Sequence, residues 1–330
     1  MEAVAEARGV VLRHSLEGHV SFTSSPYTPH LRWAAVDLSA STQFGSEAPS
    51  PVAGIVEEVL KVDCGPGPYS RVDYLVSIRV EGSSARVKVM HLEPSVKPGE
   101  RVQEGSTLGR YLRSNYFSYH HVPHLHVEVC RDRSLRPTRA LRLTPTIPPP
   151  NPPANSELEV RVEEVEDGFA LCSLVKPAHE LGVVASIGSS RRPALLNGQV
   201  GVRAEYLGLL VDGDVKVGEE VVVAGRAVAF VKACWGRRAI ALSRRRASFK
   251  SWREVVQRAY VSKSMAPQPM IEVGVEGGAV DPPVRGLELM LSKTRPVKLV
   301  PWPGRTWSRG LEGARVKLFL KLRRAPPQPS

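Results

Sequence analysis

Short runs of alternating or β-branched hydrophobic residues, separated by glycine and proline turns, dominate the first 130 positions of the chain. Such runs predict β-strands, because alternate side chains of a strand face the same side of a sheet. The expected strands are residues 10–12, 52–60, 72–80, 85–92 and 124–130. The glycine and serines at 82–84 are expected to turn a hairpin, which would place His91 near the end of its second strand. Short strands with tight turns predict a compact sandwich or barrel.

A proline-rich stretch at residues 144–156 interrupts this pattern. Polyproline is extended and semi-rigid, so we interpret it as a linker that closes a first domain of residues 1–143. Residues 157–247 then resume the strand pattern and predict a second, small β-barrel-like module. Its expected strands are residues 158–165, 182–187, 201–211, 220–230 and 239–242.

Residues 248–330 are expected to form a mixed α+β region. Hydrophobic residues at helical spacing predict an amphipathic helix over residues 251–260, and short strands follow it. The fold class predicted for the whole chain is therefore mainly β.

The composition is that of an ordinary globular protein, with 42% hydrophobic and 24% charged residues. The length of 330 residues predicts two or three domains. No signal-peptide pattern begins the chain, and no run approaches the roughly 20 apolar residues of a membrane span. We therefore expect a cytoplasmic protein without a transmembrane segment. The sequence does not specify an oligomeric state.

The four cysteines, Cys64, Cys130, Cys172 and Cys234, are far apart and form no C-x-x-C pair. Their spacing does not predict a zinc knuckle or a dense disulfide framework. Because Cys130 and Cys234 each end an apolar run, we expect both thiols to be buried.

The net charge of +12 is concentrated in the last third of the chain. Basic clusters occur at Arg237–Arg238, at residues 244–246 and at residues 321–324, with few acidic residues nearby. Such a region is able to neutralise the phosphates of nucleic acid or of anionic lipid, so an anionic partner is one interpretation. The alternative is an ordinary solvated surface.

Histidine is distributed unevenly, since all nine histidines except His179 lie at or before His126. His124 and His126 are separated by one residue, so on a strand both imidazoles project from the same face. Neutral imidazole is a common zinc ligand. The N-terminal third is therefore the part expected to carry chemistry.

Four segments of this third occur in a distinctive order. They are residues 29–38, residues 49–56, the histidine motif 90–92 continuing into a G-x-x-V-x-x-G hairpin at 96–109, and His124-Leu125-His126. In this order they resemble the lysostaphin/LytM-type zinc metallopeptidases over residues 26 to 130. The resemblance implies a duplicated-hybrid-motif β-sandwich in the N-terminal domain. It also implies zinc-dependent hydrolysis of a peptide bond in a peptide or protein substrate.

The resemblance also implies roles for single residues. Asp37 and His126 match two of the family's zinc ligands, and His91 and His124 match the two catalytic histidines that flank the water and the substrate carbonyl. The third ligand is usually a histidine four residues before the aspartate, where this chain has Trp33. An indole cannot ligate a metal. His30 would be the third ligand if residues 31–33 form a loop or bulge, and otherwise only two ligands would remain.

Two functions follow from these observations. The first is a zinc-dependent, peptidase-like hydrolase, with His30, Asp37 and His126 as metal ligands. The second is a degenerate, non-catalytic domain that binds a peptide or protein partner, with the basic C-terminal region serving an anionic partner; Trp33 favours it. Because three histidines of the motifs occur together, the hydrolase is the preferred interpretation.

Overall fold

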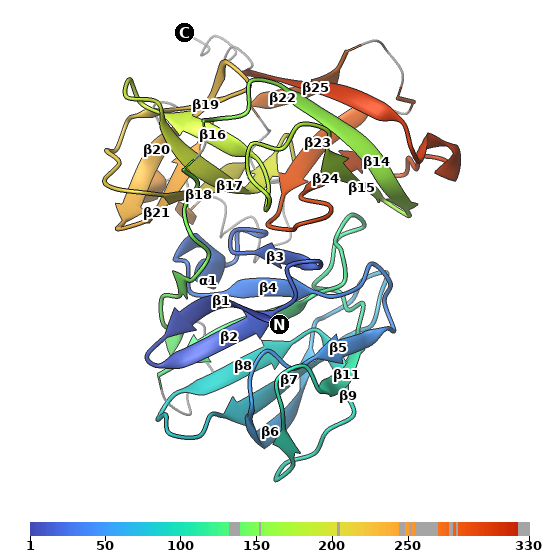
Figure 1. Ribbon diagram of the computed structural model, residues 1–330. Coiled ribbons are helices and arrows are strands. Elements are labelled where there is room, and N and C mark those ends of the chain that lie inside the picture. Colours follow the sequence, from blue (N-terminus) through green and yellow to red (C-terminus); the bar gives the residue numbers. More distant parts are fainter. Residues whose placement is uncertain are drawn as a thin grey trace, which may run out of the picture. The chain divides into compact units, whose positions relative to one another are not determined.

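The computed structural model describes residues 1–131, 139–151, 153–202, 205–243, 248–250, 253–254, 270–276, 280–281 and 283–322. The chain divides into two compact units. Unit 1 comprises Met1–Phe22 and Thr28–Pro148, and unit 2 comprises Thr23–Tyr27 and Pro149–Ser330. Antiparallel strands form the sheets of both units (Figure 1), so the prediction of a mainly β fold is confirmed.

Unit 1 is built around a seven-stranded sheet of order β10-β6-β7-β8-β12-β4-β3. These strands are β3 (His19–Ser21), β4 (Val36–Ser39), β6 (Gly54–Asp63), β7 (Val72–Arg79), β8 (Arg86–Met90), β10 (Arg101–Val102) and β12 (Leu125–Cys130). Two three-stranded sheets complete the unit. One contains β1 (Glu2–Ala7), β2 (Val10–His14) and β13 (Thr144–Pro145), and the other contains β5 (Glu47–Pro49), β9 (Leu92–Pro94) and β11 (Thr107–Tyr111).

Strand β12 lies between β8 and β4, and all six of its residues are buried. Alternation along the strand puts Val127 and Val129 on one face and His126 and Glu128 on the other. The second face is therefore a buried polar surface inside unit 1. Burying ionisable groups is unfavourable unless they are paired, so a functional site is expected on this face.

Unit 2 contains a closed six-stranded β-barrel, formed because β16 pairs with both β19 and β17. The barrel strands are β16 (Val184–Ile187), β17 (Arg192–Val200), β18 (Tyr206–Val211), β19 (Glu220–Val223), β20 (Arg226–Trp235) and β21 (Arg238–Leu242). The single strand expected over residues 220–230 is thus wrong. Ala224 and Gly225 both have positive φ, 48° and 76°, which is the conformation that a two-residue hairpin requires.

A curled extension continues from β17 in the order β23-β24-β15-β14-β25-β22. It contains β14 (Leu158–Glu166), β15 (Phe169–Leu174), β22 (Ile271–Val275), β23 (Val284–Leu289), β24 (Val297–Pro301), the 3-10 turn η2 (Arg309–Leu311) and β25 (Arg315–Leu322). Most of the helix expected at 251–260 lies outside the described residues, as do the basic residues 244–246, 323 and 324. The anionic partner therefore stays a prediction. Across the described residues, no helix has the length and apolar character needed to cross a membrane.

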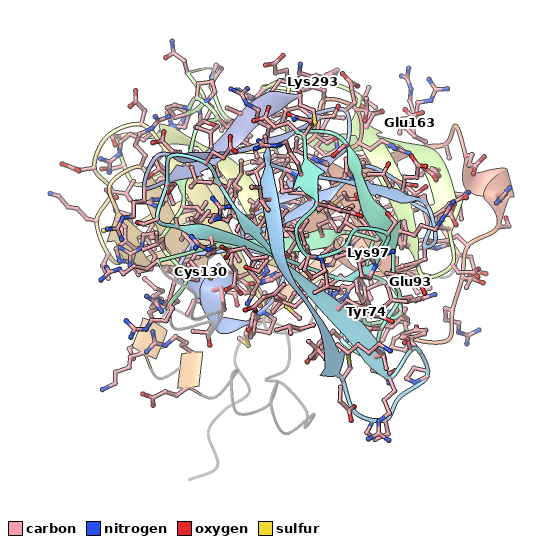
Figure 2. The ribbon with its side chains drawn as sticks, turned by 90° about the horizontal axis from the view of Figure 1, so that it is seen from below. Tyr74, Glu93, Lys97, Cys130, Glu163 and Lys293 are labelled. Carbon is pink, nitrogen blue, oxygen red and sulfur yellow. The ribbon has the colours of Figure 1, made fainter. Side chains whose placement is uncertain are left out.

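The four cysteines are free thiols. Cys130, labelled in Figure 2, ends β12 and is buried as expected. The prediction that Cys234 is buried is wrong, because its side chain is exposed. A β-bulge between Val231 and Ala233 interrupts the alternation of β20, so the apolar run before Cys234 does not carry it into the core.

Candidate metal centre

Three buried side chains of unit 1 converge on one point: His30, Asp37 and His126. Asp37 on β4 is paired directly with His126 on β12, so the two side chains share a face of the sheet. His126 Nδ1 lies 3.0 Å from Asp37 Oδ1, and His30 Nε2 lies 3.1 Å from His126 Nδ1 and 3.3 Å from Asp37 Oδ1. No other such group of three occurs in the part of the chain that the structure describes.

His30 lies at this point because the chain makes a single helical turn shortly before β4. The turn is α1 (Thr28–Leu31), and just after it the Trp33 N–H donates to the carbonyl of His30 and the Ala34 N–H to that of Pro29. Trp33 then adopts a φ of +55°, in the left-handed region that reverses the chain. Of the two alternatives left open by the sequence, the structure has the loop that brings His30 beside Asp37.

Trp33 itself is not one of the three converging side chains. Its indole is fully buried and stacks on Phe22 with ring centroids 5.4 Å apart. Among the described residues, its indole N–H has no hydrogen-bond partner. Residue 33 is therefore used here for hydrophobic packing.

The outer nitrogens of both histidines face groups that only accept hydrogen bonds. His30 Nδ1 lies 2.9 Å from the carbonyl oxygen of Phe22, and His126 Nε2 lies 2.9 Å from Glu128 Oε1. Glu128 is held as a carboxylate: burial alone would raise its pKa, but the bond to His126 and the charge of Lys88 lower it overall. Both outer nitrogens must then donate, which leaves lone pairs on His30 Nε2 and His126 Nδ1.

Three acceptor atoms thus meet in a buried place, and such an arrangement requires a cation or a proton at its centre. Burial alone would lower the pKa of His30, but the charge of Asp37 raises it overall, so this point favours positive charge. Tetrahedral ligands about 2.0–2.1 Å from zinc are about 3.3 Å from one another. The separations of 3.0–3.3 Å between the three atoms are close to that value. The residues therefore fit a zinc ion.

The two histidines predicted to be catalytic lie beside this group. The ring of His91 is 5.4 Å from that of His124 and 5.9 Å from that of His126, centroid to centroid. His124 Nε2 is 3.5 Å from Asp37 Oδ2, and its Nδ1 donates to the carbonyl of Val122 at 2.7 Å. Burial is the largest influence on His124 and lowers its pKa to about 4, so its imidazole is neutral near pH 7.

His91 is held by a buried aspartate that we did not identify from the sequence. Asp73 on β7 lies 2.7 Å from His91 Nδ1 through Oδ2 and accepts the His91 backbone N–H at 3.0 Å through Oδ1. The Ser114 hydroxyl donates to the same Oδ2 at 2.5 Å. His91 has a φ of +72°, which turns it out of the line of β8. An imidazole oriented by a buried carboxylate is a common arrangement for a general base.

Two further residues of the site were also missed, Glu128 and its partner Lys88. Lys88 Nζ lies 2.8 Å from Glu128 Oε1, and both side chains are almost completely buried. A sequence signal for Glu128 did exist, since it is two residues after His126 and must share its face of the strand. Lys88 and Asp73 had no such signal, because their contacts depend on the pairing of separate strands.

Part of the chain is similar to a known family model. A family model described as "Domain of unknown function (DUF8155) N-terminal domain" matches residues 11–145. No curated protein matches the chain. The solution structure of lysostaphin is 15% identical, with 72% of this chain and 92% of lysostaphin covered, at a TM-score of 0.30. The antimicrobial peptidase lysostaphin from Staphylococcus simulans is 14% identical, with 69% and 90% covered, at 0.29.

Proposed function

We propose that unit 1 is a zinc-dependent hydrolase that cleaves a peptide bond. The observation that carries the proposal is the convergence of three acceptor atoms, from His30, Asp37 and His126, in a buried place. The choice of a peptide bond rests on the order of the sequence motifs that resemble the lysostaphin/LytM-type peptidases.

In this proposal His30 Nε2, one Asp37 oxygen and His126 Nδ1 hold the ion. When bound, zinc would polarise the scissile carbonyl and make water more acidic. His91 takes the proton from the attacking water, and the Asp73 carboxylate stabilises the imidazolium that results. His124 is neutral with its Nδ1 proton engaged, so its Nε2 accepts a hydrogen bond and orients the water.

The test begins with the zinc content of the purified full-length chain and of His30→Ala, His126→Ala and His14→Ala variants. His14 is a matched control, because it is buried in the same unit but bonds to Ser39 and not to the site. We expect about one zinc per wild-type and His14→Ala chain, and loss in the other two variants. No zinc after zinc is supplied would overturn the proposal.

The same experiment separates the hydrolase from the non-catalytic binding domain that Trp33 favours. If zinc is bound, cleavage of a mixed peptide library is measured for wild type and for His91→Ala. Cleavage that is lost in the variant while zinc is retained supports the hydrolase. Zinc binding without cleavage of any peptide or protein offered would instead favour the binding domain.

A further inference from the structure

Residues 226–253 of unit 2 combine positive charge with aromatic side chains. These 28 residues include nine arginines or lysines and no aspartate or glutamate. They also include four aromatic residues, Phe230, Trp235, Phe249 and Trp252. Basic side chains neutralise phosphates and aromatic rings stack on bases, so this combination is typical of proteins that bind single-stranded nucleic acid. Within this stretch the structure describes residues 226–243, 248–250 and 253.

A tight hairpin of the barrel brings the first ring and the first arginine together. Strands β20 and β21 pair along their length (Figure 1), and Trp235 at the end of β20 is directly opposite Arg238 at the start of β21. Gly236 and Arg237 form the two-residue turn between them, with a φ of +59° at the glycine. Arg238 Nε donates to the Trp235 carbonyl at 3.3 Å. Because directly opposed residues share a face, the indole and the guanidinium lie side by side.

A second ring and a second arginine continue this surface. The Phe249 ring packs edge-on against that of Trp235, with centroids 6.1 Å apart and an angle of 70° between the planes. The guanidinium carbon of Arg253 lies 6.0 Å from the centroid of the Phe249 ring. Cations and rings thus alternate along what we call the aromatic–arginine surface, made by Arg238, Trp235, Phe249 and Arg253.

Solvent reaches this surface. Trp235, Arg238, Phe249 and Arg253 are all partly exposed, and Arg237 in the hairpin turn is exposed. Since no acidic residue occurs between positions 226 and 253, the charge of the stretch is positive and attracts anions. A partner with both phosphates and flat rings would therefore contact the cations and the aromatic side chains at once.

Three observations favour single-stranded nucleic acid over a membrane or a duplex. A segment that enters a lipid surface needs apolar side chains to insert, whereas the tip of this hairpin is Gly236-Arg237. Arginine, with its planar guanidinium, binds phosphate through two parallel hydrogen bonds and also stacks on rings. A duplex keeps its bases stacked on one another, so the rings of Trp235 and Phe249 can stack only on an unpaired strand.

We propose that the aromatic–arginine surface of unit 2 binds single-stranded nucleic acid. One base stacks on Trp235, and Arg237, Arg238 and Arg253 bind the phosphates on either side of it. The inference concerns a second activity of the chain and does not depend on the zinc site proposed for unit 1. Binding of this kind weakens steeply as salt rises, because each neutralised phosphate releases counterions.

The test measures the affinity of the full chain for fluorescein-labelled oligouridine and oligothymidine of about twelve nucleotides, by fluorescence anisotropy at several salt concentrations. Trp235→Ala should weaken binding at least about fivefold, through the loss of one stacked base, and Trp235→Phe should retain most of the affinity.

Trp302→Ala is the matched control. Trp302 is another exposed tryptophan of unit 2, with the Arg285 guanidinium 5.5 Å from its ring centroid. It follows β24, which is separated from β21 in the sheet by β18, β17 and β23. Its replacement should leave the affinity for the oligonucleotides unchanged.

If Trp235→Ala does not fold, Arg237→Ala tests the electrostatic part, because an exposed turn residue tolerates replacement. It should reduce the slope of log affinity against log salt by about 0.7, the share of one phosphate on a single strand. Wild-type affinity in both variants, or no binding of either oligonucleotide at low salt, overturns the inference. Tighter binding of a duplex, or binding only to vesicles that contain phosphatidylserine, overturns it as well and assigns the surface to that other partner.

Discussion

Glu128 Oε1 lies 2.9 Å from Nε2 of His126, two residues earlier on the same strand. The same oxygen is 2.8 Å from the buried ammonium of Lys88. Glu128 therefore has two effects. It directs the Nδ1 lone pair of His126 towards the centre of the site, and it neutralises a lysine that would be costly to bury alone.

Replacing this carboxylate should affect both zinc binding and stability. Glu128→Gln is expected to weaken zinc binding by about 10- to 100-fold. It should also lower the free energy of unfolding by about 3–5 kcal/mol, because Lys88 loses its counter-charge. Chelator competition and denaturant titration measure the two effects. The control is Glu288→Gln, which breaks the buried pair with Lys298 in unit 2 and should cost stability while zinc affinity is unchanged.

Asp73 allows binding and turnover to be separated. Asp73→Asn removes the negative charge beside His91 but touches none of the three proposed ligands, so zinc content should stay near one per chain. Turnover of a cleaved peptide should fall by roughly 10²-fold or more, the usual contribution of a general base. Asp63→Asn is the control, since Asp63 makes an exposed ion pair with Arg71 in the same unit. Wild-type turnover in Asp73→Asn would remove Asp73 and His91 from the mechanism.

The place of Trp33 predicts the outcome of a rescue experiment. In the double variant His30→Ala/Trp33→His, the sequence spacing typical of the family is restored. Because the side chain of residue 33 is directed into the core against Phe22, we expect zinc binding to remain lost. Zinc content measured beside the His30→Ala single variant decides this, and recovery of zinc would mean that the α1 loop can rearrange.

His14 predicts a dependence of stability on pH. Its Nε2 lies 3.0 Å from the Ser39 carbonyl oxygen, and burial lowers its pKa. The unfolded chain therefore binds the proton first, and the free energy of unfolding should fall as pH drops from about 6.5 towards the folded pKa. Denaturant titrations with a metal chelator present should show a flatter slope in this window for His14→Gln. An identical slope would contradict the assignment.

Part of this site was open to prediction from the sequence. Alternation alone places His126 and Glu128 on one face. The position of His30 beside Asp37 could not be predicted in the same way. It depends on the left-handed conformation of Trp33, which is uncommon for tryptophan and has no local sequence signature. The contact of Asp73 with His91 depends on the pairing of β7 with β8 and on the turn after Met90. Such contacts are set by tertiary packing, which no local pattern encodes.

The hydrogen bonds between Thr23 and Asn197 join residues 174 positions apart in the chain. During synthesis they cannot form until β17 (Arg192–Val200) has been made, long after Thr23. Closing so long a loop costs only slightly more entropy than closing a shorter one. The length of the loop therefore delays these hydrogen bonds during synthesis but weakens them little. The segment Thr23–Tyr27 is thus joined to unit 2 only after every strand of unit 1 has been made.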